Sequence, residues 1–232
     1  MNTSAEKIWA IIPAAGIGSR MQSDLPKQYL EVDGKTILEH SLSNFLEHSS
    51  IYKVVVPLHP NDRYWSKLKV SSHQKIITVA GGEERANSVL NALNYIIEQG
   101  GLNDWVMVHD AARPCLSSHH IDNLIRAREN SADGAILAIP SVDTVKVSNA
   151  RLTIDKTIPR ETIWLAQTPQ FFEIGKLAQA IDLAIQNDLL VTDEASAMEA
   201  QGFSPSLVIG NRKNLKITEP EDMMLASIWL NQ

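Results

Sequence analysis

A glycine-rich segment near the start of the chain has the residue types of a phosphate-binding loop. It reads Pro13-Ala14-Ala15-Gly16-Ile17-Gly18-Ser19-Arg20-Met21 and follows a short apolar stretch. Small residues after a strand let backbone N–H groups approach a phosphate closely. Arg20 and Lys27 flank the segment, and Pro26 fixes the backbone just before Lys27. We therefore expect a phosphate cradle with two cations beside it.

A dinucleotide-binding loop would begin in a similar way, with glycines between a strand and a helix. Here Met21 stands at the position of the third glycine, and Pro26 interrupts the helix that should follow. Because that motif has meaning only in its strand-turn-helix context, the sequence argues against a dinucleotide site.

Together with Pro26-Lys27-Gln28-Tyr29-Leu30, the glycine-rich segment resembles the signature of the 2-C-methyl-D-erythritol 4-phosphate cytidylyltransferase family. Further segments similar to that family's motifs follow in its order through most of the chain. They are Gly81-Gly82-Glu83-Glu84-Arg85-Ala86-Asn87-Ser88-Val89, Val108-His109-Asp110-Ala111-Ala112-Arg113-Pro114, Asp143-Thr144-Val145-Lys146, Thr168-Pro169-Gln170, Thr192-Asp193-Glu194-Ala195 and Lys216-Ile217-Thr218.

The resemblance implies that the phosphate of methylerythritol phosphate attacks the α-phosphorus of CTP and displaces pyrophosphate. Fixed cations, together with Mg²⁺ as cofactor, would stabilise the charge that gathers on the α-phosphoryl group. Arg20 and Lys27 match the family's catalytic residues, and no metal-ligating residue is assigned from the sequence. The implied nucleotide-binding residues are Ala14, Ala15, Gly16, Gly18, Gly82, Glu83 and Ser88.

The resemblance also implies a homodimer whose acceptor sites draw on both subunits. Arg160 and Thr168 would complete the partner's site, whereas Thr144, Arg113 and Lys216 would act in their own chain. The implied substrate-binding residues are Asp110, Arg113, Thr144, Arg160, Thr168 and Lys216.

Several of these residues have a structural alternative. Glu83 and Ser88 precede or begin a helical pattern, where acids and serine are common as caps. Asp110 and Arg113 could simply brace the turn before a proline. Arg85 is expected to make structural ion pairs and His109 to pack, because an anionic acceptor phosphate needs no general base.

Short apolar runs alternate with helical patterns, which predicts a parallel sheet covered on both faces. Helical spacing is found within residues 37–46 and 89–97. The expected fold class is α/β with a doubly wound, mostly parallel sheet of the Rossmann-like nucleotidyltransferase kind, in a single domain of residues 1–232. The runs span residues 8–12, 53–56, 75–79, 105–108 and 135–139.

From residue 143 the pattern changes to two short alternating strands around Asn149-Ala150, which predicts a β-hairpin. A hairpin with so few apolar residues must lie on this chain's own sheet or on a second subunit. We expect residues 143–160 to form a projecting dimerisation arm. A helix over 173–187, a strand over 206–209 and a final helix capped by Thr218 follow it.

Composition excludes several classes of protein. The 232 residues are 44% hydrophobic and 21% charged, which is typical of a globular chain, and the net charge of -6 offers no field for a nucleic acid. Cys115 alone forms no disulfide framework and is expected to pack. The chain shows no signal peptide or membrane span, so the expected location is the cytoplasm.

Two other functions fit parts of the pattern. A cytidylyltransferase for another polyol phosphate, such as ribitol 5-phosphate, would share the glycine-rich segment and Pro26-Lys27-Gln28, although Ala14-Ala15-Gly16 favours the methylerythritol enzymes. A non-catalytic nucleotide sensor would keep the loop and Ser88 but would not need a set of cations along one phosphate path. Those cations are Arg20, Lys27, Arg113, Arg160 and Lys216.

Overall fold

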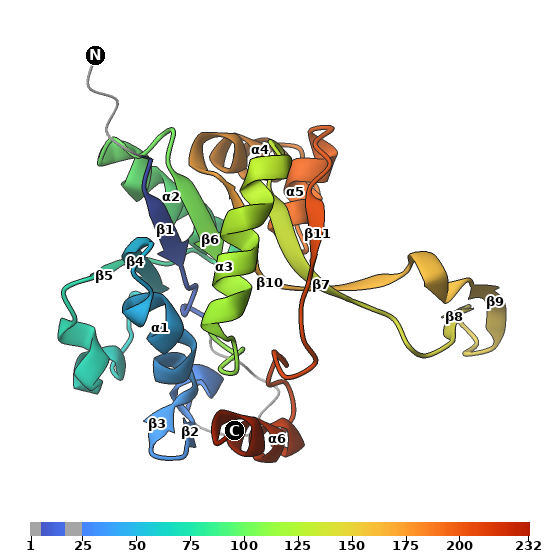
Figure 1. Ribbon diagram of the computed structural model, residues 1–232, viewed down its shortest axis with the longest axis horizontal. Coiled ribbons are helices and arrows are strands. Elements are labelled where there is room, and N and C mark those ends of the chain that lie inside the picture. The colour runs from blue at the N-terminus through green and yellow to red at the C-terminus, as the bar shows by residue number, and fades with distance from the viewer. Residues whose placement is uncertain (1–5, 17–24) are drawn as a thin grey trace.

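The computed structural model describes residues 6–16 and 25–232 of the chain (Figure 1). Among these residues, the centre is a seven-stranded sheet in the order β11-β7-β10-β6-β1-β4-β5. Every neighbouring pair is parallel except those of β10, which runs antiparallel to both β6 and β7. The strands are β1 (Ile8–Ile11), β4 (Ile51–Leu58), β5 (Ile76–Ala80), β6 (Trp105–Val108), β7 (Ala135–Pro140), β10 (Trp164–Glu173) and β11 (Ser206–Ile209).

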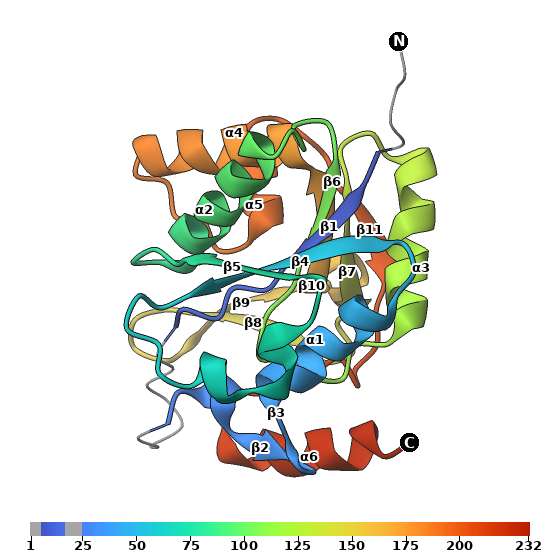
Figure 2. The same cartoon turned by 90° about the vertical axis from the view of Figure 1, so that its left-hand side faces the viewer.

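Helices cover both faces of this sheet, so the predicted doubly wound α/β class is confirmed. Figure 2 shows α2, α4 and α5 on one side and α1 and α3 on the other. Alternate strand residues feed the two cores: Ala10 packs into the α1 and α3 side, and Ile11 into the α2 side. The helices are α1 (Ile37–Glu47), α2 (Arg85–Glu98), α3 (Ser118–Ala127), α4 (Ile174–Gln186), α5 (Glu194–Ala200) and α6 (Pro220–Leu230).

Short elements complete the described part of the chain. The two-stranded sheet of β2 and β3 leads into α1, where Thr36 and Glu39 form a reciprocal capping box. Helix α6 packs beside β2 through Val32, Ile217 and Ala226. The short elements are β2 (Glu31–Val32), β3 (Lys35–Thr36) and the 3₁₀ turns η2 (Lys27–Tyr29), η3 (Trp65–Lys67), η4 (Lys69–Ser72), η5 (Arg128–Asn130) and η6 (Arg160–Thr162).

The predicted strands and the helix near 173–187 are present, but local pattern did not reveal β10. Its apolar residues are interrupted by Gln167, Thr168 and Pro169, and its pairing with β7 shifts register between Ala166 and Gln170. The bond between Thr168 and Pro169 is cis. A strand that enters the middle of the sheet in the opposite direction is stabilised by partners distant in sequence, so its own pattern is weak.

The start of the last helix differs from the prediction by one residue. Glu219, not Thr218, is the N-cap, because Pro220 takes the first helical position. The Asp222 carboxylate accepts the N–H groups of Thr218 and Glu219 at 2.8 and 3.0 Å. The Thr218 hydroxyl instead donates to the carbonyl of Lys216 at 3.1 Å.

The predicted hairpin is formed by β8 (Val145–Ser148) and β9 (Ile154–Ile158), which pair antiparallel in a sheet of their own. Figure 1 shows it extending away from the rest of the chain. It therefore does not lie on this chain's own sheet, and Leu152 and Ile154 near its tip are exposed. Its role in subunit contact stays a prediction.

Over the described residues, no helix combines the length and the apolar character needed to cross a membrane.

Candidate active site

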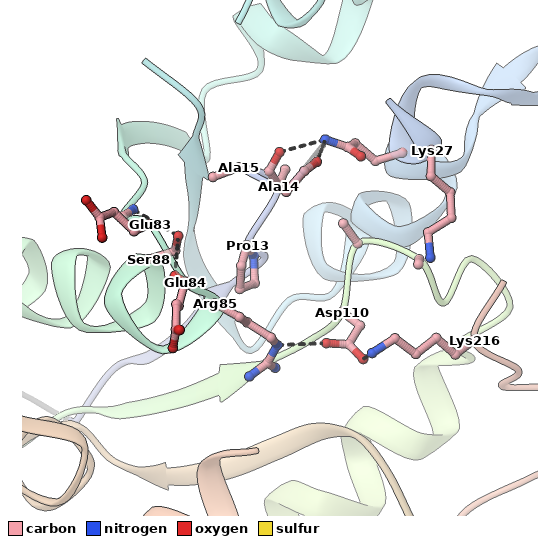
Figure 3. Close-up of a pocket in the computed structure, with 15 residues that line it drawn as sticks. Pro13, Ala14, Ala15, Lys27, Glu83, Glu84, Arg85, Ser88, Asp110 and Lys216 are labelled. Atoms are coloured by element: carbon pink, nitrogen blue, oxygen red, sulfur yellow. Dashed lines mark hydrogen bonds and ion pairs between the residues drawn. The ribbon is translucent and has the colours of Figure 1, made fainter. Parts of the chain in front are cut away.

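A cavity of about 230 Å³ opens at the carboxyl edge of the parallel strands, between the first loop and the start of α2 (Figure 3). This is the edge at which open α/β sheets bind their ligands. Its lining residues are Pro13, Ala14, Ala15, Gly16, Lys27, Gln28, Gly82, Glu83, Glu84, Arg85, Ser88, Asp110, Ala111, Ala112 and Lys216. Most of the predicted nucleotide residues thus meet here, whereas Gly18 and Arg20 lie outside the described residues.

The buried side chain of Gln28 holds the described part of the glycine-rich segment in place. Its amide Nε2 donates to the carbonyl of Ala14 at 2.7 Å and to that of Gly16 at 2.9 Å. These two hydrogen bonds fix the backbone at residues 14 and 16. The sequence showed Gln28 only as part of the family signature, and gave no hint of this contact.

The second loop, after β5, is built around Ser88. The Ser88 hydroxyl accepts the N–H of Gly82 at 3.0 Å and donates to the carbonyl of Glu84 at 3.1 Å. A Cβ on Gly82 would come within 2.3 Å of the Asn87 side chain, so only glycine fits this approach. Ser88 therefore shapes the loop from one turn inside α2.

The capping alternative for Glu83 and Ser88 is wrong. Glu84 is the N-cap of α2, and its N–H donates to the side chain of Asn87 at 3.3 Å. Glu83 precedes the cap, is exposed and lines the cavity. Glu83 is thus available to a ligand through its side chain, whereas buried Ser88 acts through the loop that it holds.

Asp110 is the electrostatic centre of the site. Its carboxylate lies 3.1 Å from Nε of Arg85, 2.9 Å from Nζ of Lys216 and 3.6 Å from Nε of Arg113. Burial alone would raise the pKa of Asp110, but Arg85, Lys216 and Arg113 hold it well below its usual range. Figure 3 shows Asp110 between Arg85 and Lys216.

Arg85 makes structural ion pairs, as the sequence predicted. Besides Asp110, it binds the buried carboxylate of Glu194 through both terminal nitrogens, at 2.5 and 3.1 Å. The guanidinium thereby joins the start of α2 to β6 and α5. It also lines the cavity, so it contributes to the field there.

His109 packs, as predicted, and it also orders a chain of hydrogen bonds. Its Nε2 lies 3.0 Å from the carbonyl of Arg113, and its Nδ1 lies 3.0 Å from the Thr168 hydroxyl, which accepts the N–H of Asp110 at 3.0 Å. Burial lowers the pKa of His109 to about 4, so the ring is neutral at pH 7. A neutral ring donates from Nε2 and accepts at Nδ1, which fits both contacts.

Thr168 corrects one prediction. The sequence interpretation assigned it to the partner's site, yet its hydroxyl is buried against Asp110 and His109 of its own chain. The reason is β10, which places residue 168 beside the end of β6. Thr168 therefore lines a cavity of its own chain, together with Asp110.

Lys27 and the C-terminal segment meet at the same edge. The Lys27 ammonium donates to the carbonyl of Ile217 at 2.7 Å, next to Lys216. The Ile217 N–H donates to the carbonyl of Ala112 at 2.8 Å. Lys27 is thus held by the residue next to Lys216, which brings two cations from opposite ends of the sequence to the same edge.

A second cavity of about 210 Å³ adjoins the first and shares Arg85, Asp110 and Lys216 with it. The sequence interpretation gave no role to Thr192, Gln167 or Gln170, although two of them occur in the quoted motifs. Only the fold shows that β10 and the start of α5 face this cavity. Its other lining residues are Arg113, Ala166, Gln167, Thr168, Gln170, Thr192 and Asp193.

Thr144 and Arg160 are not brought to either cavity. Both are exposed residues at the base of the hairpin, and the Arg160 guanidinium donates to the carbonyl of Val142. Thr144 was expected to act in the same chain as Lys216. Its location near Arg160, away from both cavities, does not support that expectation.

The described residues do not form a protein-built metal site. They contain no group of three or more His, Cys, Asp or Glu side chains arranged to hold an ion. The carboxylate of Asp110 is already bound by cations, which disfavours a divalent ion at the same oxygens. A metal here would have to bring most of its ligands with it, as an ion bound to a triphosphate does.

The start of the glycine-rich segment, the set of cations and two adjoining cavities lie at the carboxyl edge of an α/β sheet. Together they define a nucleotide-dependent group-transfer protein. The model of the family described as 2-C-methyl-D-erythritol 4-phosphate cytidylyltransferase matches residues 8–232. Proteins of that name from Shewanella sediminis and Vibrio vulnificus are 51% and 47% identical over 99% and 100% of this chain, and over 97% and 98% of their own length. The crystal structure of the Francisella tularensis protein is 40% identical, with a TM-score of 0.84 over 97% of this chain and 100% of that one. The chain belongs to this cytidylyltransferase family.

We predict that Arg85→Met destabilises the fold by about 3 kcal/mol, because it leaves Asp110 and Glu194 buried without their shared cation. The pKa of Asp110 rises in the variant. Since a depressed carboxyl pKa stabilises the fold above its unfolded value of about 4, the loss is largest at pH 7 and narrows as the pH falls below about 4. Urea unfolding at several pH values measures it.

The control is Arg126→Met, which removes an exposed guanidinium from α3. Equal losses for the two variants, or a loss for Arg85→Met that grows as the pH falls, would contradict the role given to Arg85.

Proposed function

We infer that this protein carries out the reaction of its family, the transfer of a cytidylyl group from CTP to 2-C-methyl-D-erythritol 4-phosphate. An oxygen of the acceptor phosphate forms a bond to the α-phosphorus, and the bond from that phosphorus to the bridging oxygen of pyrophosphate breaks. The products are 4-diphosphocytidyl-2-C-methyl-D-erythritol and pyrophosphate, in the non-mevalonate isoprenoid pathway. The meeting of the glycine loop, Lys27 and the Asp110–Lys216 pair at one edge carries this inference.

CTP would occupy the first cavity. The backbone of residues 14–16 and of Gly82, with Glu83 and the loop that Ser88 holds, would contact the cytosine and the ribose. The triphosphate would then run toward Lys27 and Arg20. In support, these described residues line one cavity, and the contacts of Gln28 and Ser88 set the loop conformations before any ligand arrives.

Lys27 and Arg20 would stabilise charge on the α-phosphoryl group as pyrophosphate leaves. Such charge stabilisation is most effective when the donors are already in place, and Lys27 is fixed by the Ile217 carbonyl. The acceptor phosphate is an anionic nucleophile, so the neutral ring of His109 is not required to remove a proton.

The acceptor would occupy the second cavity. Lys216 and Arg113 suit its phosphate, and the Asp110 carboxylate can accept a hydrogen bond from a substrate hydroxyl. Thr168 would hold the backbone of Asp110 in place rather than contact a partner subunit. Because the two cavities share Asp110 and Lys216, both substrates would be bound next to each other.

We propose that Mg²⁺ is the cofactor and enters bound to the triphosphate. It would supply charge neutralisation on the phosphate oxygens of the leaving pyrophosphate. The protein's own cations would act on the α-phosphoryl and acceptor groups. We also place the reaction in the cytoplasm, a location that suits a chain with one cysteine.

We further propose a homodimer in which the hairpin of residues 143–160 reaches the partner. A two-stranded hairpin with exposed Leu152 and Ile154 is marginal alone in water, which favours a subunit contact. Arg160, and Thr144 beside it, would then serve the partner's acceptor site. This revises the expectation that Thr144 acts in its own chain.

We predict that Lys27→Ala lowers turnover about 10²-fold or more, because a preorganised cation at the transferred phosphoryl group is lost. Pyrophosphate release is measured with CTP, Mg²⁺ and methylerythritol phosphate. Lys35→Ala is the matched control, since it removes an exposed lysine of the same region that lines neither cavity.

Pyrophosphate release by Lys27→Ala at the wild-type rate would contradict the catalytic role of Lys27. Release with ribitol 5-phosphate but not with methylerythritol phosphate would assign a different acceptor, and binding of CTP without release would indicate a nucleotide sensor. Full activity in the presence of EDTA would contradict the Mg²⁺ proposal.

We predict that mixing Arg160→Ala protein with Lys27→Ala protein restores roughly a quarter of the wild-type activity. Random exchange makes half of the dimers hybrids, and each hybrid has one site with both residues intact. Absence of recovery, despite subunit exchange demonstrated by mass spectrometry, would show that Arg160 does not act across the dimer.

A further inference from the structure

The segment Asn214–Ile217 links the two substrate sides of the pocket. It connects β11 to α6 and carries two adjacent contacts, the Lys216 ammonium 2.9 Å from Asp110 and the Ile217 carbonyl 2.7 Å from the Lys27 ammonium. The Lys216 side chain is 48% exposed, so its own packing does little to fix it. Its location depends on where the backbone of this segment is held.

Asn214 attaches the segment to the centre of the sheet. It is fully buried, and its Nδ2 donates to the carbonyl of Thr168 on β10 at 2.8 Å. Its own carbonyl accepts a hydrogen bond from the Arg113 guanidinium at 2.7 Å. Asn214 therefore fixes the segment to β10. It also orients Arg113, which lines the second cavity.

The same amide is poorly suited to a purely structural role. Oδ1 of Asn214 has no hydrogen-bond partner in the described part of the chain, although the side chain is fully buried. An unpaired buried acceptor costs about 1–3 kcal/mol, and removing Nδ2 would in turn leave the Thr168 carbonyl without its donor. The benefit of asparagine here is that its Nδ2 fixes the backbone of the segment against β10.

We propose that Asn214 is a positioning residue for the transfer reaction, acting on the acceptor through Lys216 and Arg113. The proposal rests on the acceptor site described under the proposed function. Asn214 touches neither substrate. It holds the backbone from which the Lys216 ammonium reaches Asp110, and it presents the carbonyl that orients Arg113. Ile217 has its own anchor on Ala112, so the Lys27 contact on the nucleotide side is held independently.

A double-mutant cycle of Asn214→Ala and Lys216→Ala tests this role, with pyrophosphate release as the assay. We expect Asn214→Ala to lower kcat/KM for the acceptor about 10- to 100-fold, mainly through a higher acceptor KM, with the KM for CTP changed less than about twofold. In the Lys216→Ala background the same change should cost less than it does in the wild-type background, because one of the two residues that it positions is absent.

Asn211→Ala is the matched control, since Asn211 is an exposed asparagine in the same connection and bonds only locally to the N–H of Lys213 among the described contacts of its side chain. Thermal unfolding of each variant measures stability alongside. If Asn214→Ala does not fold, Asn214→Ser, which keeps a short polar side chain, takes its place in the cycle.

The possible results distinguish a failure of the positioning role of Asn214 from a failure of the proposed acceptor site. Loss of activity in Lys216→Ala, with Asn214→Ala equal to Asn211→Ala, overturns the positioning role and leaves the acceptor site intact. Additive losses in the double variant, or equal rises of both KM values, also overturn it. Wild-type activity in Lys216→Ala overturns the acceptor site itself.

Discussion

The site depends on one buried carboxylate. Asp110 stands at the end of a central strand, is 10% exposed in its side chain, and binds Arg85, Arg113 and Lys216, which come from different parts of the chain. A charge in this place is stable only when it is paired, and the cations around it would repel one another without it. Its position is fixed in turn by the hydroxyl of Thr168. The same interaction therefore holds Arg85 and Lys216, which line both cavities, and Arg113, which lines the second.

This arrangement explains how an acidic chain can hold two anionic substrates. The net charge of -6 describes the whole surface, whereas substrate binding depends on the field at one edge of the sheet. There, the carboxylates of Asp110 and Glu194 hold cations in place. These hydrogen bonds do not occupy every N–H donor of the cations. Lys27 is held separately, by the backbone carbonyl of Ile217.

Much of the fold could be read from the sequence, because strands buried on both faces leave a continuous apolar pattern and the glycine loop marks the end of the first one. What could not be read is the part that depends on distant partners. β10 runs antiparallel between β6 and β7, and this puts Thr168 beside Asp110 of its own chain. The roles of Gln28 and Asn214 were equally invisible, since a buried amide has no periodicity and its partners lie far along the chain.

We propose that the two cavities are the two halves of one active site, joined at Asp110. A crystal structure with CTP, Mg²⁺ and an unreactive methylerythritol phosphate analogue tests it most directly. We expect the triphosphate to lie beside residues 14–16 and Lys27, and the acceptor phosphate to contact Lys216 and Arg113. An acceptor bound away from the second cavity, or a triphosphate bound with Lys27 still on the Ile217 carbonyl and out of reach, would contradict it.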